Sequence, residues 1–380
     1  MRSGRLAAPK MRRMPVEFIT MAPTAGDGRY VGVANLANQR VAGWTAPPER
    51  EPSLEYLSRI ARAAEAGGFS TLLLPVGTGC LDGWASAASL IPLTQRLRFM
   101  VAVRPGFVQP AVAARQATTF DYLSGGRLSI NVVTGGSPDE LARDGDFLDH
   151  AARYRRTREF VRIMKLLFEQ ERVTFEGEFF RLRDARLHPR PVQHPWPPFY
   201  IAGASEEGVR MAAEEADIYM LWGETLDNVR QRIDSVRAAA QAVGRTLRYS
   251  ISFQVILGET EEAAWRRTDE MLSRLDPAFV ARQSEFFRRI DSVGQQRLVS
   301  LMQGARERSF RLGPNLWAGL TQVMSGNSIA LVGTPDQVVD RLVEYLRLGF
   351  DTVLLRGFPH LETIEEIGRE IIPRIHARVA

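Results

Sequence analysis

Two junctions between a predicted strand and the helix after it carry the residues best suited to bind a ligand. His150 and Tyr154 are four residues apart, so they share one face at the start of a helix predicted near 151–168. The segment Gly203-Ala204-Ser205 stands at a second such junction. Helix N-termini offer unpaired N–H groups and partial positive charge, which suit an anion such as phosphate. The two junctions therefore indicate either a site for a phosphorylated ligand or, at Ser205, a plain helix N-cap.

Other common catalytic sites are missing from the sequence. None of the five histidines has the spacing of a zinc site, and no G-x-S-x-G motif marks a hydrolase nucleophile, so we predict no metal and no hydrolytic triad. Cys80 is the single cysteine and cannot form a disulfide within the chain, which fits a reducing cytoplasm. By residue type alone, Cys80 is more often a small buried side chain than a nucleophile.

Composition points to a globular enzyme of ordinary type. The net charge of +5 comes from arginines interleaved with acidic residues, so we expect neither nucleic acid nor a membrane surface as partner. No apolar run approaches the roughly 18 residues that a membrane span needs. Residues 1–14 are basic but lack the apolar core of a signal peptide, and we predict a disordered tail there.

Short apolar runs rich in β-branched residues alternate with amphipathic stretches of helical length. Strands are predicted at 16–21, 71–75, 98–103, 128–133, 199–202, 218–222, 249–257 and 352–355. Helices are predicted at 53–66, 110–122, 151–168, 206–215, 228–242, 260–275, 334–348 and 362–379. Eight strands with helical crossovers favour parallel pairing. An open doubly wound sheet is the rival, but its glycine-rich turn is incomplete at 77–82. We predict a closed (β/α)8 barrel as one domain over 15–380.

Two irregular stretches interrupt this alternation. Residues 276–327 are polar and separate the seventh and eighth predicted strands, and residues 136–149 follow the fourth. Loops after the strands of such a barrel build its active face, so 276–327 is predicted to be a lid insertion. The alternative is a pair of flexible surface loops.

Several motifs resemble the luciferase-like flavin monooxygenases. AARQA at 113–117, LSGGR at 123–127 and NVVTG at 131–135 resemble the signature region of that family. GDFLDH at 145–150, DSVGQQR at 291–297, PNLWAG at 314–319 and GFPHLE at 357–362 are similar, more narrowly, to the alkanesulfonate monooxygenases. The resemblance covers the chain from about residue 16 to its end.

The resemblance implies a (β/α)8 TIM barrel of the luciferase-like type that binds reduced FMN (FMNH2) and oxygen. A separate NAD(P)H-dependent FMN reductase would supply the flavin, and the protein would be a homodimer or homotetramer. By position, the cofactor would contact Asn131, Thr134, His150, Tyr154, Ala204 and Ser205. The implied catalytic positions are Cys80, Trp222, Ser252, Gln254, Arg297, Phe358 and His360, with Arg297 in a mobile lid that keeps water from the oxygenated flavin.

The chain departs from the alkanesulfonate pattern where the family binds its sulfonate. Ser252 and Gln254 replace an arginine and a histidine, Phe358 replaces a tyrosine, and Ala25 replaces a histidine. A serine cannot reproduce the charge-assisted contact of an arginine with an anion. We therefore expect altered specificity, with a neutral sulfone, sulfonamide, amide or heterocycle held by Gln254 as the alternative to C–S cleavage of an alkanesulfonate. A deazaflavin-dependent dehydrogenase and a flavin-binding barrel without turnover are the remaining alternatives.

Overall fold

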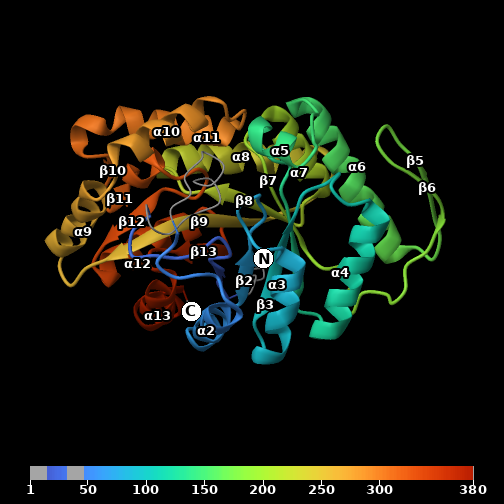
Figure 1. Ribbon diagram of the computed structural model, residues 1–380, viewed down its shortest axis with the longest axis horizontal. Helices are drawn as coiled ribbons and strands as arrows, with labels where there is room; N and C mark the ends of the chain where they lie inside the picture. The colour runs from blue at the N-terminus through green and yellow to red at the C-terminus, as the bar shows by residue number, and fades with distance from the viewer. Residues whose placement is uncertain (1–14, 32–46, 380) are drawn as a thin grey trace, which may run out of the picture.

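Eight parallel strands close into a barrel in the computed structural model, which describes residues 15–31 and 47–379 (Figure 1). The barrel order is β1 (Glu17–Met21), β2 (Thr71–Leu74), β3 (Arg98–Val103), β4 (Leu128–Val132), β7 (Phe199–Ala202), β8 (Ile218–Trp222), β9 (Arg248–Leu257) and β13 (Thr352–Arg356). Parallel pairing of β13 with β1 and of β9 with β8 completes the ring. The predicted fold class is confirmed. The tail predicted at 1–14 lies outside the described residues.

Helices surround the barrel and carry the chain back to the start of the next strand (Figure 1). They are α2 (Leu54–Ala66), α3 (Gly83–Leu90), α4 (Pro110–Ser124), α6 (His150–Glu169), α7 (Glu206–Glu215), α8 (Leu226–Ala242), α12 (Pro335–Arg347), α13 (His360–Glu370) and α14 (Ile372–Val379). Local sequence fixes their ends. Ser53 caps α2 by accepting the Tyr56 N–H, and Gly125 ends α4 in the left-handed conformation at φ 66°.

The barrel interior is filled by every second strand residue. Ile19, Met100, Tyr200, Ile218 and Leu354 form one buried cluster inside the ring. Because side chains alternate along a strand, the residue two positions beyond each of these faces the same side, one layer nearer the carboxyl-end mouth. The strands therefore deliver a second set of inward side chains to the mouth, where they meet the loops.

The segment 276–327, called the insertion below, is folded in the structure. It follows α9 (Glu261–Ser273) and contains α10 (Pro277–Arg288), α11 (Val293–Gly304) and the short strands β10 (Arg311–Gly313) and β11 (Leu316–Trp317). The 3-10 turns are η1 (Ile91–Leu93), η2 (Arg306–Arg308) and η3 (Gly319–Gln322). A ninth parallel partner, β12 (Ala330–Gly333), pairs with the carboxyl-terminal half of β9 and was not predicted. In Figure 1, α10 and α11 lie together above the end of the barrel where β8 and β9 finish.

Three further elements differ from the predictions. The stretch expected to be irregular at 136–149 contains the short helix α5 (Pro138–Arg143). A hairpin of β5 (Val173–Glu176) and β6 (Arg181–Ala185) follows α6 and projects away from the barrel at the right of Figure 1. The single C-terminal helix expected at 362–379 is two helices, α13 and α14, because the chain breaks its helical path at Ile371.

Candidate functional site

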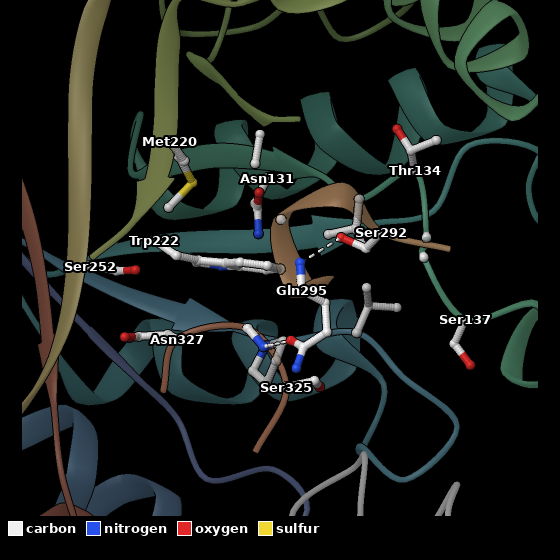
Figure 2. A pocket seen from close by; sticks show the side chains of 18 of the residues that line it. Asn131, Thr134, Ser137, Met220, Trp222, Ser252, Ser292, Gln295, Ser325 and Asn327 are labelled. Carbon is white, nitrogen blue, oxygen red and sulfur yellow. Dashed lines mark hydrogen bonds between the residues drawn. The ribbon is translucent and has the colours of Figure 1, made fainter. Parts of the chain in front are cut away.

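A cavity of about 450 Å³ opens at the carboxyl-end mouth of the barrel, within the usual size range of small-molecule sites. Its wall combines strand ends of the barrel with the insertion. Figure 2 shows Asn131, Met220 and Trp222 from the barrel around the same space as Gln295 and Asn327 from the insertion. Ten of the predicted site residues lie on this wall: Cys80, Asn131, Thr134, His150, Tyr154, Ala204, Ser205, Trp222, Ser252 and His360.

One end of the cavity is formed by the N-termini of α6 and α7, and we call it the cradle: His150, Tyr154 and residues 203–208. The rings of His150 and Tyr154 lie 5.0 Å apart, as their spacing on one helix face requires. Ser205 lines the cavity with them, and burial raises the pKa of the Tyr154 phenol, so it stays protonated and able to donate at neutral pH. Tertiary packing therefore joins the two predicted junctions into one site.

The backbone of the cradle leaves no space for a side chain where its two glycines meet. A Cβ added to Gly203 would lie 2.7 Å from the Cα of Gly208, and one added to Gly208 would lie 3.1 Å from the Tyr154 hydroxyl. Arg232 also lines the cavity here and donates to the Ala204 carbonyl at 2.9 Å. The result is a concave surface of backbone, hydroxyl and guanidinium donors, the donor set that a phosphate needs.

The lowered pKa of the Glu207 carboxyl indicates the electrostatic character of the cradle. Its pKa is lowered although the side chain is exposed, chiefly by its own backbone N–H, and further by the Ser205 hydroxyl and the nearby His150. Groups that stabilise a carboxylate at this point would stabilise another anion in the same way. The cradle therefore favours negative charge at its surface.

The middle of the cavity carries polar groups on an otherwise apolar wall. Asn131 is on β4, and Thr134 follows that strand, with its buried Oγ1 lacking a hydrogen-bond partner among the described residues. Cys80 reaches the wall from the loop after β2. Trp222, at the end of β8, lies between two glycines of the insertion: a Cβ on Gly294 would lie 3.0 Å from the indole, and one on Gly326 would lie 3.2 Å from it. The insertion thus packs its backbone directly against the barrel.

A buried carboxylate–imidazole pair holds another residue of the wall, His360, in place. Asp27 Oδ1 lies 2.8 Å from His360 Nδ1, and Tyr56 donates its hydroxyl to the other carboxylate oxygen. Burial opposes the charge of Asp27, but the attraction and hydrogen bond of His360, with help from Tyr56 and the Gly28 N–H, bring its pKa below the ordinary value. The ionised Asp27 fixes the proton of His360 on Nδ1. Nε2 is buried without a hydrogen-bond partner in the described part of the chain.

Three predicted catalytic side chains do not reach the cavity wall. Gln254 is fully buried, donates from Nε2 to the Asn327 carbonyl at 2.7 Å and does not line the cavity, so its contact with a substrate stays a prediction. Phe358 packs in a core cluster, with its ring edge-on to His360 at 5.1 Å. Arg297 does not itself line the cavity but is paired with Glu224, a cavity residue, at 2.8 Å.

One ion pair and one backbone hydrogen bond, both made by Asp291, also fix the insertion on the barrel. Arg153 of α6 is almost fully buried and pairs with Asp291 at 2.5 Å, while its other nitrogen donates to the Leu148 carbonyl. The Asp291 N–H donates to the Gly136 carbonyl in the loop after β4. The insertion is therefore positioned by the same loop and helix that carry Thr134 and the cradle.

The wall also contains functional candidates that the sequence did not single out. Arg232 and Arg356 were not among the predicted site residues, and neither was Asp27, which contacts His360 without lining the cavity itself. Arg356 is the last residue of β13 and lines the cavity. Its position at the carboxyl end of a barrel strand was the available signal, because such positions face the active side of the fold.

The described residues form neither a metal-binding group nor a helix that could span a membrane. Within residues 15–31 and 47–379, no group of three or more His, Cys, Asp or Glu side chains could hold a metal ion. Over the same ranges every helix is too short or too polar to cross a lipid bilayer.

Comparison with known proteins gives a family match and a set of similar folds. The family model described as "Luciferase-like monooxygenase" matches residues 31–352. A riboflavin lyase solved with modified FMN and riboflavin is 21% identical, covers 96% of this chain and 92% of its own, and has a TM-score of 0.76. The EDTA monooxygenase of Chelativorans sp. BNC1 is 21% identical over 96% and 94% of the two chains, with a TM-score of 0.74. A long-chain alkane monooxygenase is 20% identical over 96% and 92%, with a TM-score of 0.76.

Proposed function

The chain belongs to the luciferase-like monooxygenase family, and we propose that it is the oxygenase of a two-component system that uses reduced FMN. One oxygen atom of O2 enters a small organic substrate and the other leaves as water, while FMNH2 gives up two electrons and two protons and becomes FMN. A separate NAD(P)H-dependent reductase regenerates the flavin. The observation that carries this proposal is the cradle of donors at one end of a cavity in the barrel mouth.

The residues present fit FMN. The cradle has the donors for its phosphate: the N-termini of α6 and α7, Tyr154, Ser205 and Arg232. Asn131 and the unpartnered Thr134 hydroxyl supply polar contacts along the wall for the ribityl chain and ring. Bound there, the reduced flavin supplies the electrons that activate oxygen.

The protein contributes orientation, exclusion of water and proton handling. The insertion forms part of the cavity wall and is held by Arg297–Glu224 and Arg153–Asp291, which would limit the access of bulk water to the cavity. His360 donates its Nδ1–H to the Asp27 carboxylate, so its Nε2 is the nitrogen that can accept a proton or return it. Similar folds include an EDTA monooxygenase and a long-chain alkane monooxygenase, so the fold alone does not define the substrate.

Anaerobic titration with two reduced flavins tests the phosphate assignment. We expect wild-type protein to bind FMNH2 more tightly than reduced riboflavin, which lacks the phosphate. Tyr154→Phe combined with Ser205→Ala removes two cradle hydroxyls and should reduce that preference at least tenfold. Ser53→Ala is the matched control, since Ser53 caps α2 in the same way as Ser205 caps α7 and does not line the cavity.

Oxygen consumption tests the reaction class. With an FMN reductase and NAD(P)H, a suitable substrate should raise oxygen uptake above the background of free reduced flavin. Absence of any affinity for FMNH2 would overturn the proposal. Binding without uptake above background would leave a flavin-binding protein, and turnover with a reduced deazaflavin without oxygen would indicate a dehydrogenase.

A further inference from the structure

Arg356 stands at the mouth of the barrel with its guanidinium in the interior. It is two residues beyond Leu354, which belongs to the cluster inside the barrel, so both side chains face inward. Arg356 lines the cavity, yet only 6% of it is exposed. A cationic side chain therefore reaches the wall of the cavity from a rigid strand and not from a mobile loop.

This guanidinium lacks the partners that buried arginines normally have. Among the described residues no carboxylate lies within 4.0 Å of it, and its Nε has no hydrogen-bond partner. Nη1 lies 3.2 Å from the sulfur of Met21, which is a weak acceptor. Burial lowers the pKa of Arg356 to about 10, so the group still carries its charge at neutral pH.

The other arginines of the cavity wall are accounted for. Arg104 is paired with Glu140 at 2.8 Å and with Asp144 at 3.3 Å. Arg232 donates to the Ala204 carbonyl within the cradle. A charged group buried without a partner is costly, and such groups are found paired with an ion or a ligand. Of the three arginines on this wall, Arg356 is the one that has neither a carboxylate nor a carbonyl partner among the described residues.

The position of Arg356 separates it from the cradle. β13 is four strands from β4 in either direction around the ring, so Arg356 stands across the mouth from Asn131 and Thr134. The strand register places it beside Gln254 of β9, whose side chain is turned to Asn327. The Asn327 side chain itself lines the cavity, and neither its Oδ1 nor its Nδ2 has a partner in the described part of the chain.

We propose that Arg356 binds an anionic group of the substrate, a carboxylate, sulfinate or sulfonate, with the Asn327 amide as a neutral second contact. The inference rests on the proposed function, in which the flavin would occupy the opposite part of the cavity. An anionic substrate differs from the neutral substrate expected from the sequence. That expectation was based on the uncharged Ser252 and Gln254 and did not consider the positive charge of Arg356 on β13. An alkanesulfonate is one member of the class; an alkyl carboxylate is another.

Matched pairs of ligands isolate the contribution of charge. Octane-1-sulfonate and octane-1-sulfonamide differ little in shape, as do octanoate and octanamide, but one member of each pair is anionic. Ligand-observed NMR titration of the FMN-loaded protein should show that the anion binds at least tenfold more tightly than the amide. Arg356→Met should reduce that preference below about twofold, and Arg356→Lys should keep most of it because the charge remains.

Two further measurements on the same variants separate this inference from the proposed function. The affinity of Arg356→Met for FMNH2 should stay within about twofold of wild type, and its Tm should be equal or higher, because an apolar side chain replaces an unpaired buried cation. A tenfold loss of FMNH2 affinity with an unchanged ligand preference would assign Arg356 to the flavin and overturn the inference. Equal binding of both members of each pair, or binding of neither, would overturn it as well.

Discussion

Nη2 of Arg297 lies 2.8 Å from Oε2 of Glu224, and Nε of the same guanidinium lies 3.1 Å from Oε1. This forked ion pair joins α11 of the insertion to the loop after β8. Glu224 is itself held, because Asn228 donates to Oε2 at 3.0 Å and Tyr345 donates to its carbonyl at 2.7 Å. The pair therefore connects the insertion to a fixed point of the barrel, and its rupture is the step that would open the mouth.

Arg297→Gln should loosen α11 without unfolding the barrel. Loss of a charge-assisted, partly buried contact worth about 1.5 kcal/mol would raise amide exchange over Val293–Gly304 about tenfold in hydrogen-exchange mass spectrometry. Oxygen uptake should also become less coupled to product, with more hydrogen peroxide released. Arg288→Gln is the control, because Arg288 pairs with Glu285 on the exposed side of α10. Equal exchange in both variants would contradict the role given to Arg297.

Glu207→Gln should tighten the binding of FMN. Its own backbone N–H and the Ser205 hydroxyl lower the pKa of the Glu207 carboxyl, so this carboxylate competes with a phosphate for donors of the cradle and repels its charge. We expect the Kd for FMNH2 to fall about threefold or more and the Kd for reduced riboflavin to stay constant. Glu206→Gln removes the same charge from the same helical turn, where Glu206 pairs with Arg210, and should have the smaller effect. Equal effects of the two variants would count against the cradle.

His360→Asn should slow turnover about 100-fold at pH 7, the usual contribution of a positioned acid–base group, with FMNH2 affinity within about twofold of wild type. Substrate-dependent oxygen uptake should fall through kcat, with the KM for the substrate within about twofold of wild type. Tyr56→Phe is the milder control, because Asp27 keeps its 2.8 Å contact with His360 when the Tyr56 hydroxyl is removed. A kcat that stays unchanged in His360→Asn would exclude proton transfer by this group.

Asp146→Asn should destabilise the loop that leads into the cradle. Arg156 donates to Asp146 Oδ1 at 3.1 Å, and both side chains are largely buried. Burial opposes the charge of Asp146, but the Arg156 contact brings its pKa below the ordinary 3.8. The ionised form therefore stabilises the fold above pH 3.8, and this stabilisation is lost as the pH falls through the lower native value.

The resulting pH dependence is the measurement for Asp146. At pH 7 urea unfolding should show a loss of about 3 kcal/mol in Asp146→Asn, as expected when one partner of a buried ion pair is removed. The two proteins should approach the same stability only below about pH 3.8, the ordinary value for this carboxyl. A difference that is constant between pH 7 and pH 3 would show that the pair is not ionic in origin.

Much of the barrel could be predicted because its strands are buried on both faces. β3, β7 and β8 begin and end where the apolar runs do, and α7 has the predicted bounds. The elements of the insertion were not predicted. α10 buries Phe279, Phe286 and Phe287 on one face, but it lies in a stretch that was interpreted as one polar insertion, so no separate helix was assigned there. β12 is a four-residue strand that exists because β9 offers it a partner.

The sequence by itself determined the eight-strand alternation and the shared face of His150 and Tyr154, because spacing within one element is set by its own period. Only the tertiary structure decided which side chains meet across elements. It placed Tyr154 and Ser205 on the wall of the same cavity and brought the Gln254 side chain within hydrogen-bond distance of the Asn327 carbonyl. It also placed the Arg356 guanidinium at that wall, with no carboxylate partner among the described residues. Such contacts follow from the packing of segments far apart in the chain, which no local pattern encodes.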